Sequence, residues 1–77
     1  MIPEMYAQAE AITPSDTVGF TKGLCRAIYV GGAGNFVALV DGVAITFNGA
    51  LAGNIYPIQA TRVNSTSTTA TNLVALF

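Results

Sequence analysis

The chain has 77 residues, of which 52% are hydrophobic and only 9% are charged, and its formal net charge is −1. A domain of this size buries only about 60% of the surface of its unfolded chain, so it usually needs disulfides, a metal or partner subunits for stability. One cysteine and no histidine exclude an intrachain disulfide and disfavour a zinc site, which leaves association with other subunits.

The scarcity of charged residues and the hydropathy pattern also limit the classes of molecule that the chain is expected to bind. Only Lys22, Arg26 and Arg62 are cationic, which is too few to neutralise a run of phosphates, so nucleic-acid binding is not expected. No stretch approaches the roughly 20 apolar residues of a membrane-spanning helix, and the N-terminus lacks the basic and apolar regions of a secretory signal. We therefore expect no membrane partner, synthesis in the cytoplasm, and a surface covered by neighbouring subunits.

The chain divides into an N-terminal arm, residues 1–11, and a single β domain, residues 12–77. Short isolated helices are weak, so an extended arm is favoured over a helix that starts near Pro3. The arm contains Ile2, Met5 and Tyr6, which predict that it lies on an apolar surface.

Beyond residue 20, short apolar runs alternate with glycine and asparagine, which is typical of an all-β protein. Residues 24–30 predict a central strand, because both of its faces are largely apolar. The glycines of residues 31–35 predict a sharp hairpin turn. Asp41-Gly42 lies between two apolar runs and predicts a two-residue type I′ hairpin, with Val43, Ile45 and Phe47 on one face of its second strand.

The last third of the chain predicts two further strands. Residues 55–63 are a strand candidate that Pro57 confines to a sheet edge or a strand start. Residues 64–72 are rich in Asn, Ser and Thr and predict a loop, and residues 73–77 predict a docked final strand. The predicted fold is a small antiparallel β-barrel or sandwich of five or six short strands with an N-terminal arm.

No catalytic, cofactor or metal site is predicted. The four acidic residues are assigned to turns or to the arm, and Cys25 has no histidine to activate it, so it is expected to be a small buried hydrophobe. The glycine-rich segment 31–35 follows a strand as a phosphate-binding loop does. It lacks the lysine, the hydroxyl residue and the helix that such a loop requires.

The tyrosines are the most informative candidates for contacts. Such side chains usually act as anchors in a core or an interface, and the alternative is stacking on a sugar. The candidate assembly contacts are Ile2, Met5, Tyr6, Tyr29, Tyr56 and Phe77.

The order of the turn and strand signatures resembles that of one family, the small head-spike base proteins of gene transfer agents and related tailed phages. The resemblance covers roughly residues 11–77, and two loops, 48–53 and 64–67, depart from the family pattern. The residues that carry the resemblance are Ile12 to Thr17, Ala27 to Asn35, Asp41 to Phe47, Ala52-Gly53, Pro57-Ile58 and Thr68 to Thr71.

This resemblance implies a virion structural protein on the outer surface of a capsid, acting as a head-spike base or as a decoration (cement) subunit. The implied partners are the major capsid protein, further copies of the chain in a homo-oligomer and, in that family, a spike fibre protein. The alternative function is a carbohydrate- or receptor-binding module of a phage particle. A small hydrolase that depends on Cys25 is a third class, for which we expect no turnover.

Overall fold

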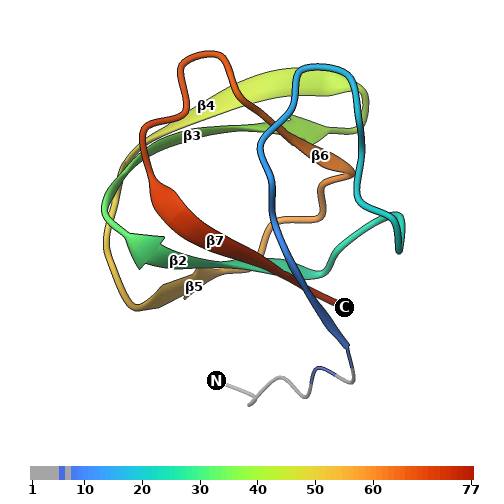
Figure 1. Ribbon diagram of the computed structural model, residues 1–77, viewed down its shortest axis with the longest axis horizontal. Coiled ribbons are helices and arrows are strands. Elements are labelled where there is room, and N and C mark those ends of the chain that lie inside the picture. The colour runs from blue at the N-terminus through green and yellow to red at the C-terminus, as the bar shows by residue number, and fades with distance from the viewer. Residues whose placement is uncertain (1–5, 7) are drawn as a thin grey trace.

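The computed structural model describes Tyr6 and residues 8–77, so the predicted contacts Ile2 and Met5 lie outside the described residues. Two antiparallel sheets pack face to face, with strand orders β1-β7-β2-β5 (sheet A) and β4-β3-β6 (sheet B) (Figure 1). The predicted all-β class is confirmed, and the architecture is a sandwich and not a closed barrel. The strands are β1 (Ala9–Ala11), β2 (Ala27–Gly32), β3 (Gly34–Val40), β4 (Val43–Ala50), β5 (Asn54–Tyr56), β6 (Arg62–Asn64) and β7 (Thr71–Leu76).

The hairpin at Asp41-Gly42 forms as predicted. Asp41 has φ 52° and Gly42 has φ 78°, and a type I′ turn requires positive φ at both central positions. Val40 is therefore paired with Val43, and the register runs on from there between β3 and β4. The hairpin fixes which side chains of β4 face the core.

The glycine-rich segment turns the chain sharply, but the predicted hairpin there is wrong. β2 belongs to sheet A and β3 to sheet B, so residues 31–34 form a corner that passes between the sheets. A Cβ on Gly34 would lie 2.6 Å from the backbone nitrogen of Ala70. Glycine is needed at this corner because the backbone of the loop before β7 approaches it closely.

The predicted strand over residues 55–63 is two strands. β5 ends at Tyr56 and β6 begins at Arg62, and the two lie in different sheets. Pro57, which has no N–H to donate to a ladder, follows β5 directly, and the next N–H, of Ile58, donates to the Tyr56 carbonyl at 2.8 Å. The described chain thus has seven strands, more than the five or six expected.

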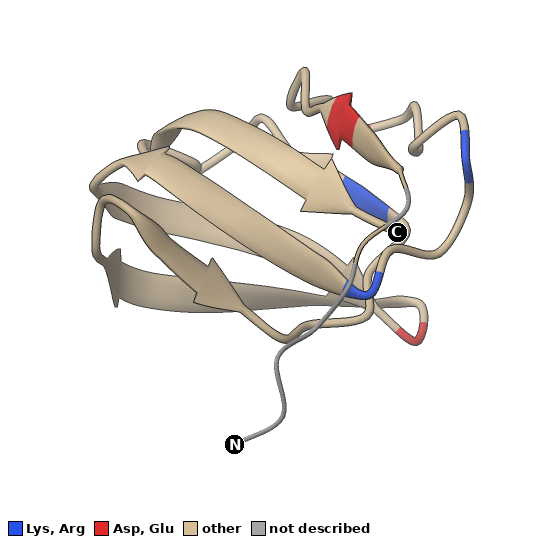
Figure 2. Ribbon diagram, turned by 90° about the horizontal axis from the view of Figure 1, so that it is seen from below, with Lys and Arg blue, Asp and Glu red and all other residues tan. Residues whose placement is uncertain are grey.

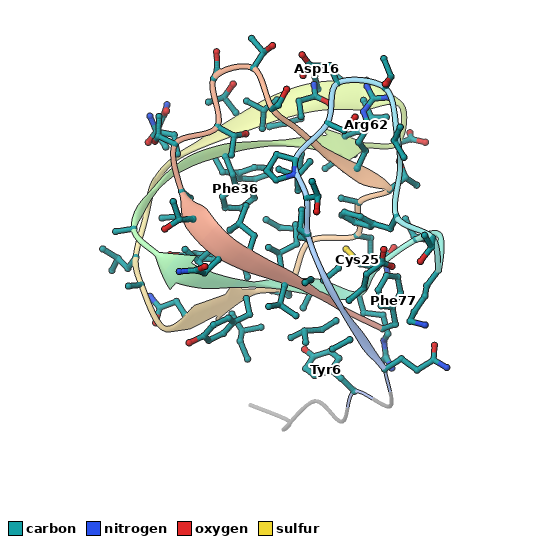
Figure 3. The ribbon with its side chains drawn as sticks, viewed as in Figure 1. Tyr6, Asp16, Cys25, Phe36, Arg62 and Phe77 are labelled. Carbon is teal, nitrogen blue, oxygen red and sulfur yellow. The ribbon has the colours of Figure 1, made fainter. Side chains whose placement is uncertain are left out.

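The core lies between the two sheets and is centred on Phe36. Its ring stacks on Phe47 at a centroid distance of 5.1 Å and lies 6.2 Å from the ring of Tyr56. Figure 3 shows Phe36 pointing into the space between the sheets. The largest fully buried side chains are Phe36, Ile28, Val30, Val63 and Cys25.

The last three residues of the predicted arm are part of sheet A. They form β1, which pairs with β7 from Ala9↔Leu76 to Ala11↔Val74. The boundary between arm and domain at residue 12 stays a prediction.

Candidate assembly surface

The described residues contain no cluster of three or more His, Cys, Asp or Glu side chains that could hold a metal ion. No helix long and apolar enough to cross a membrane occurs in the part of the chain that the structure describes. The features that stand out are apolar surfaces, and two of them are built by the strands.

The first surface is a row of side chains that crosses the outer face of sheet A. Tyr29 is paired with Ile55 on one side and with Val74 on the other, and Val74 is paired with Ala11. Directly paired residues share a face of a sheet. Tyr29 lies between the buried core residues Ile28 and Val30, so it and its paired neighbours face away from the core.

We call these four residues, Ala11, Val74, Tyr29 and Ile55, the outer row. Ile55 is 50% exposed, Ala11 is exposed, and Tyr29 and Val74 are half-buried. The row carries no charge, and its one polar group is the Tyr29 hydroxyl. A tyrosine in an apolar strip combines a large contact area with one hydrogen-bonding group, as anchors in protein interfaces do.

The second surface is the side of the sandwich where β4 and β5 form the sheet edges; we call it the open side. Phe47 is paired with the core residue Phe36 and faces the interior side of sheet B. Val43 and Ile45 lie at alternate positions on the same strand, so they face the same side as Phe47. They remain 56% and 40% exposed, since β4 is the edge strand. Leu51, in the connection from β4 to β5, is 60% exposed.

A groove runs along one end of the open side. It has a volume of about 510 Å³ and lies between the end of the β3–β4 hairpin and the segment after β5. Its lining is mostly apolar and consists of Leu24, Val40, Asp41, Phe47, Pro57, Ile58 and Gln59. An exposed apolar groove of this kind is typical of an interaction surface.

Charges are unevenly distributed over the molecule. In Figure 2 the coloured segments gather toward the end that holds the C-terminus and the β3–β4 turn, and the opposite end is uncoloured. That uncharged end contains the passages from β2 to β3 and from β4 to β5 (Figure 1). Neither the outer row nor β4 contains a charged residue.

The predicted contact residues lie in different settings. Tyr29 is in the outer row. Tyr56 is half-buried and turns toward Phe36, and its hydroxyl accepts a hydrogen bond from the Leu51 N–H at 2.9 Å. Phe77 packs edge-on against Phe20 at 6.2 Å, and its N–H donates to the Gln8 carbonyl at 2.8 Å.

Tyr6 is half-buried, and Figure 3 shows it on the side of sheet A that is turned away from sheet B. It therefore lies on the same side of the sandwich as the outer row. The structure does not bring Tyr6, Tyr29, Tyr56 and Phe77 together into one patch, and their role as assembly contacts stays a prediction.

Two carboxylates hold loops in place. The carboxylate of Glu10 accepts backbone N–H groups of Thr21 and Lys22 at 3.2 and 3.4 Å. The backbone hydrogen bond from Thr21 is the main cause that lowers the pKa of Glu10. For Asp16, the hydrogen bond from the Thr66 hydroxyl is the main cause that lowers the pKa.

Cys25 is fully buried, and its thiol donates to the Ile58 carbonyl at 3.3 Å. Burial raises the pKa of the thiol, which keeps it in the unreactive protonated form. Its location agrees with the expected small buried hydrophobe.

Sequence reasoning missed the residues of the open side. The sequence pattern places Val43 and Ile45 in a strand, but alternation alone does not tell whether an apolar face is covered by another sheet. The sequence feature that could have indicated this surface is the length of β4, which has eight residues and neither a charged residue nor a proline. Edge strands usually carry charged residues or proline, which prevent pairing with other chains.

Comparison with known proteins identifies a relative of known structure. No protein-family model and no curated protein sequence matches the chain. A chain in the solved structure of the capsid of a native GTA (gene transfer agent) particle, computed with C5 symmetry, matches with a TM-score of 0.84 and 31% sequence identity. The match covers 95% of this chain and 84% of that chain.

Proposed function

Because the chain belongs to the family of gene transfer agent capsid proteins represented by that relative, we propose that it docks on the outside of a phage-like capsid. In this role it is a decoration (cement) subunit or the base subunit of a head spike. It contacts the major capsid protein and other copies of itself, and a spike base would also hold a fibre protein. The mature protein is located in the particle, on its outer surface.

The main support for the proposal is the extent of the structural match to the capsid chain. A TM-score of 0.84 over 95% of the chain means that the whole sandwich, and not one motif, is shared with a protein of a capsid. Fold alone does not determine function, but 31% identity over that length connects the two sequences as well as the two folds.

The outer row supports a role in docking. Its residues lie on one face of sheet A, carry no charge and include a tyrosine anchor. A contact of modest strength is sufficient, because a capsid presents many equivalent sites and neighbouring subunits add avidity when they also contact one another. Catalysis is not part of the proposal, since docking requires no reactive group.

The proposal is tested by adding purified protein to particles that lack it and measuring how much protein sediments with them. The variant Tyr29→Asp places a charge at the centre of the outer row and is expected to reduce bound protein at least tenfold. Val18→Asp is the matched control, because Val18 is 67% exposed and lies in the loop before β2, outside the row. Equal binding by Tyr29→Asp and wild type would exclude the outer row as the docking surface.

The alternative function is a carbohydrate- or receptor-binding module. Binding of the same purified protein to a glycan array distinguishes this function from docking on a capsid. Selective binding of one sugar class by the isolated subunit, without sedimentation on particles, would contradict the docking role. We expect sedimentation and no selective glycan binding.

A further inference from the structure

The ladder between β3 and β4 is interrupted by a β-bulge near the end of β4. The pairing shifts by one residue between Gly34 and Phe36, so Asn35 lies opposite two residues of β4, Asn48 and Gly49. Both of these residues are exposed. Gly49 has φ +74°, which glycine adopts without strain and which is common in bulges of this kind.

The two bulge residues form the one Asn-Gly pair of the chain. Such a pair is especially prone to spontaneous deamidation, because glycine has no side chain beside the nitrogen that attacks. The Gly49 nitrogen would give its proton to solvent and bond to the side-chain amide carbon of Asn48, which closes a succinimide ring. The amide nitrogen takes up a proton and leaves as ammonia. Water then opens the ring at either carbonyl, and the product is aspartate or isoaspartate.

The surroundings of the bulge leave room for this ring. A Cβ placed on Gly49 would meet nothing within 4 Å. Asn48 is exposed and lies on a strand that pairs with β3 on one side only. Water therefore reaches the site, and no neighbouring backbone blocks it.

The attacking nitrogen, however, is engaged in the folded chain. The Gly49 N–H donates to Oδ1 of Asn35 at 2.9 Å. This bond holds the proton that must be lost and keeps the nitrogen directed toward β3. It has to break before the nitrogen can attack Asn48, so it opposes the first step of the reaction.

Asn35 is itself held firmly in place. Its N–H donates to Oγ1 of Thr69 at 2.9 Å, and its carbonyl accepts the N–H groups of Thr69 and Ala70 at 2.8 and 2.9 Å. Three hydrogen bonds thus fix its backbone to the loop before β7. The side-chain oxygen starts from this fixed backbone, so little conformational entropy remains to be lost when it binds Gly49.

We propose that Asn48 is a site of spontaneous deamidation and that Asn35 controls its rate by holding the Gly49 nitrogen. The reaction is slow in the folded protein and proceeds when the bulge opens locally. Its product places a negative charge in β4, which has no charged residue, and a charge on an edge strand opposes pairing with other chains. The modification needs only the isolated chain, so it is independent of docking on a capsid.

Peptide mapping by mass spectrometry during long incubation at mildly alkaline pH measures the conversion of Asn48. Asn35→Leu removes the acceptor and is expected to raise the rate at least tenfold. Asn35→Asp keeps an oxygen acceptor at the same place and is expected to retain the slow rate. Wild type unfolded in urea should convert at least tenfold faster than folded wild type.

The control for general destabilisation is Gly23→Ala. Gly23 has φ +87° and lies in the loop before β2, outside sheet B, so this variant is strained but keeps the bulge. Its rate at Asn48 is expected to stay near that of wild type. Equal rates for folded and unfolded wild type, or for Asn35→Leu and Asn35→Asp, would overturn control by Asn35. Conversion at Asn64 in place of Asn48 would overturn the site.

Discussion

Asp16 and Thr66, fifty residues apart in the sequence, are joined by two hydrogen bonds. The carboxylate of Asp16 accepts the Thr66 backbone N–H at 3.0 Å and the Thr66 hydroxyl at 2.6 Å. These bonds hold the segment after β1 against the loop between β6 and β7, the same region in which Ser15 donates to the Val63 carbonyl. The segment after β1 is thereby fixed to sheet B.

We predict that stability decreases at acid pH through this contact and through Glu10. The pKa of each carboxyl is lowered in the folded protein, so their contribution is present above the unfolded-state pKa, about 4, and is lost as pH falls through the lowered values. Urea unfolding measured from pH 7 downward should show the loss. Asp16→Asn and Thr66→Val should each make the decrease in the free energy of unfolding with falling pH shallower. The double variant should show the same pH dependence as Asp16→Asn alone.

Truncation of Phe36 should be the most damaging change in the core. Its ring is fully buried and contacts the rings of Phe47 and Tyr56. Phe36→Ala should lower the free energy of unfolding by about 3–5 kcal/mol, which is a large part of the stability of a small domain. Phe36→Leu should cost less, and equal losses for the two variants by chemical denaturation would argue against a cavity as the cause.

The two glycine positions Gly34 and Gly23 should respond differently to alanine. A Cβ on Gly34 would meet the backbone of Ala70 at 2.6 Å, whereas a Cβ on Gly23 would meet nothing within 4 Å. Gly23 has φ +87°, so Gly23→Ala should cost about 1–2 kcal/mol from backbone strain alone. Gly34→Ala should lower the melting temperature more than Gly23→Ala does; the reverse order would contradict the close approach at the corner.

Cys25 should be unreactive in the folded protein. Its thiol is buried and bonded to the Ile58 carbonyl, and burial raises its pKa. A thiol reagent should therefore label it only as fast as the protein opens, and denaturant should accelerate labelling strongly. Rapid labelling under native conditions would show that the thiol is accessible.

The parts of the fold that could be predicted from sequence are those encoded locally. Asp41-Gly42 determines its own hairpin because both residues tolerate positive φ, and the alternation in residues 43–47 gives the correct shared face. The corner at Gly34 could not be distinguished from a hairpin, since glycines permit both, and the choice depends on contact with Ala70, distant in sequence. The exposure of Ile45 likewise depends on which sheet lies opposite β4.

We propose that this protein is a structural component on the outside of a phage-like capsid. Electron cryo-microscopy of particles made with and without the chain tests it most directly, by difference density at matched resolution. We predict density of the size of this sandwich on the outer capsid surface, at the five-fold vertices for a spike base or at two-fold or three-fold positions for a cement subunit. Identical maps from the two preparations would contradict the claim.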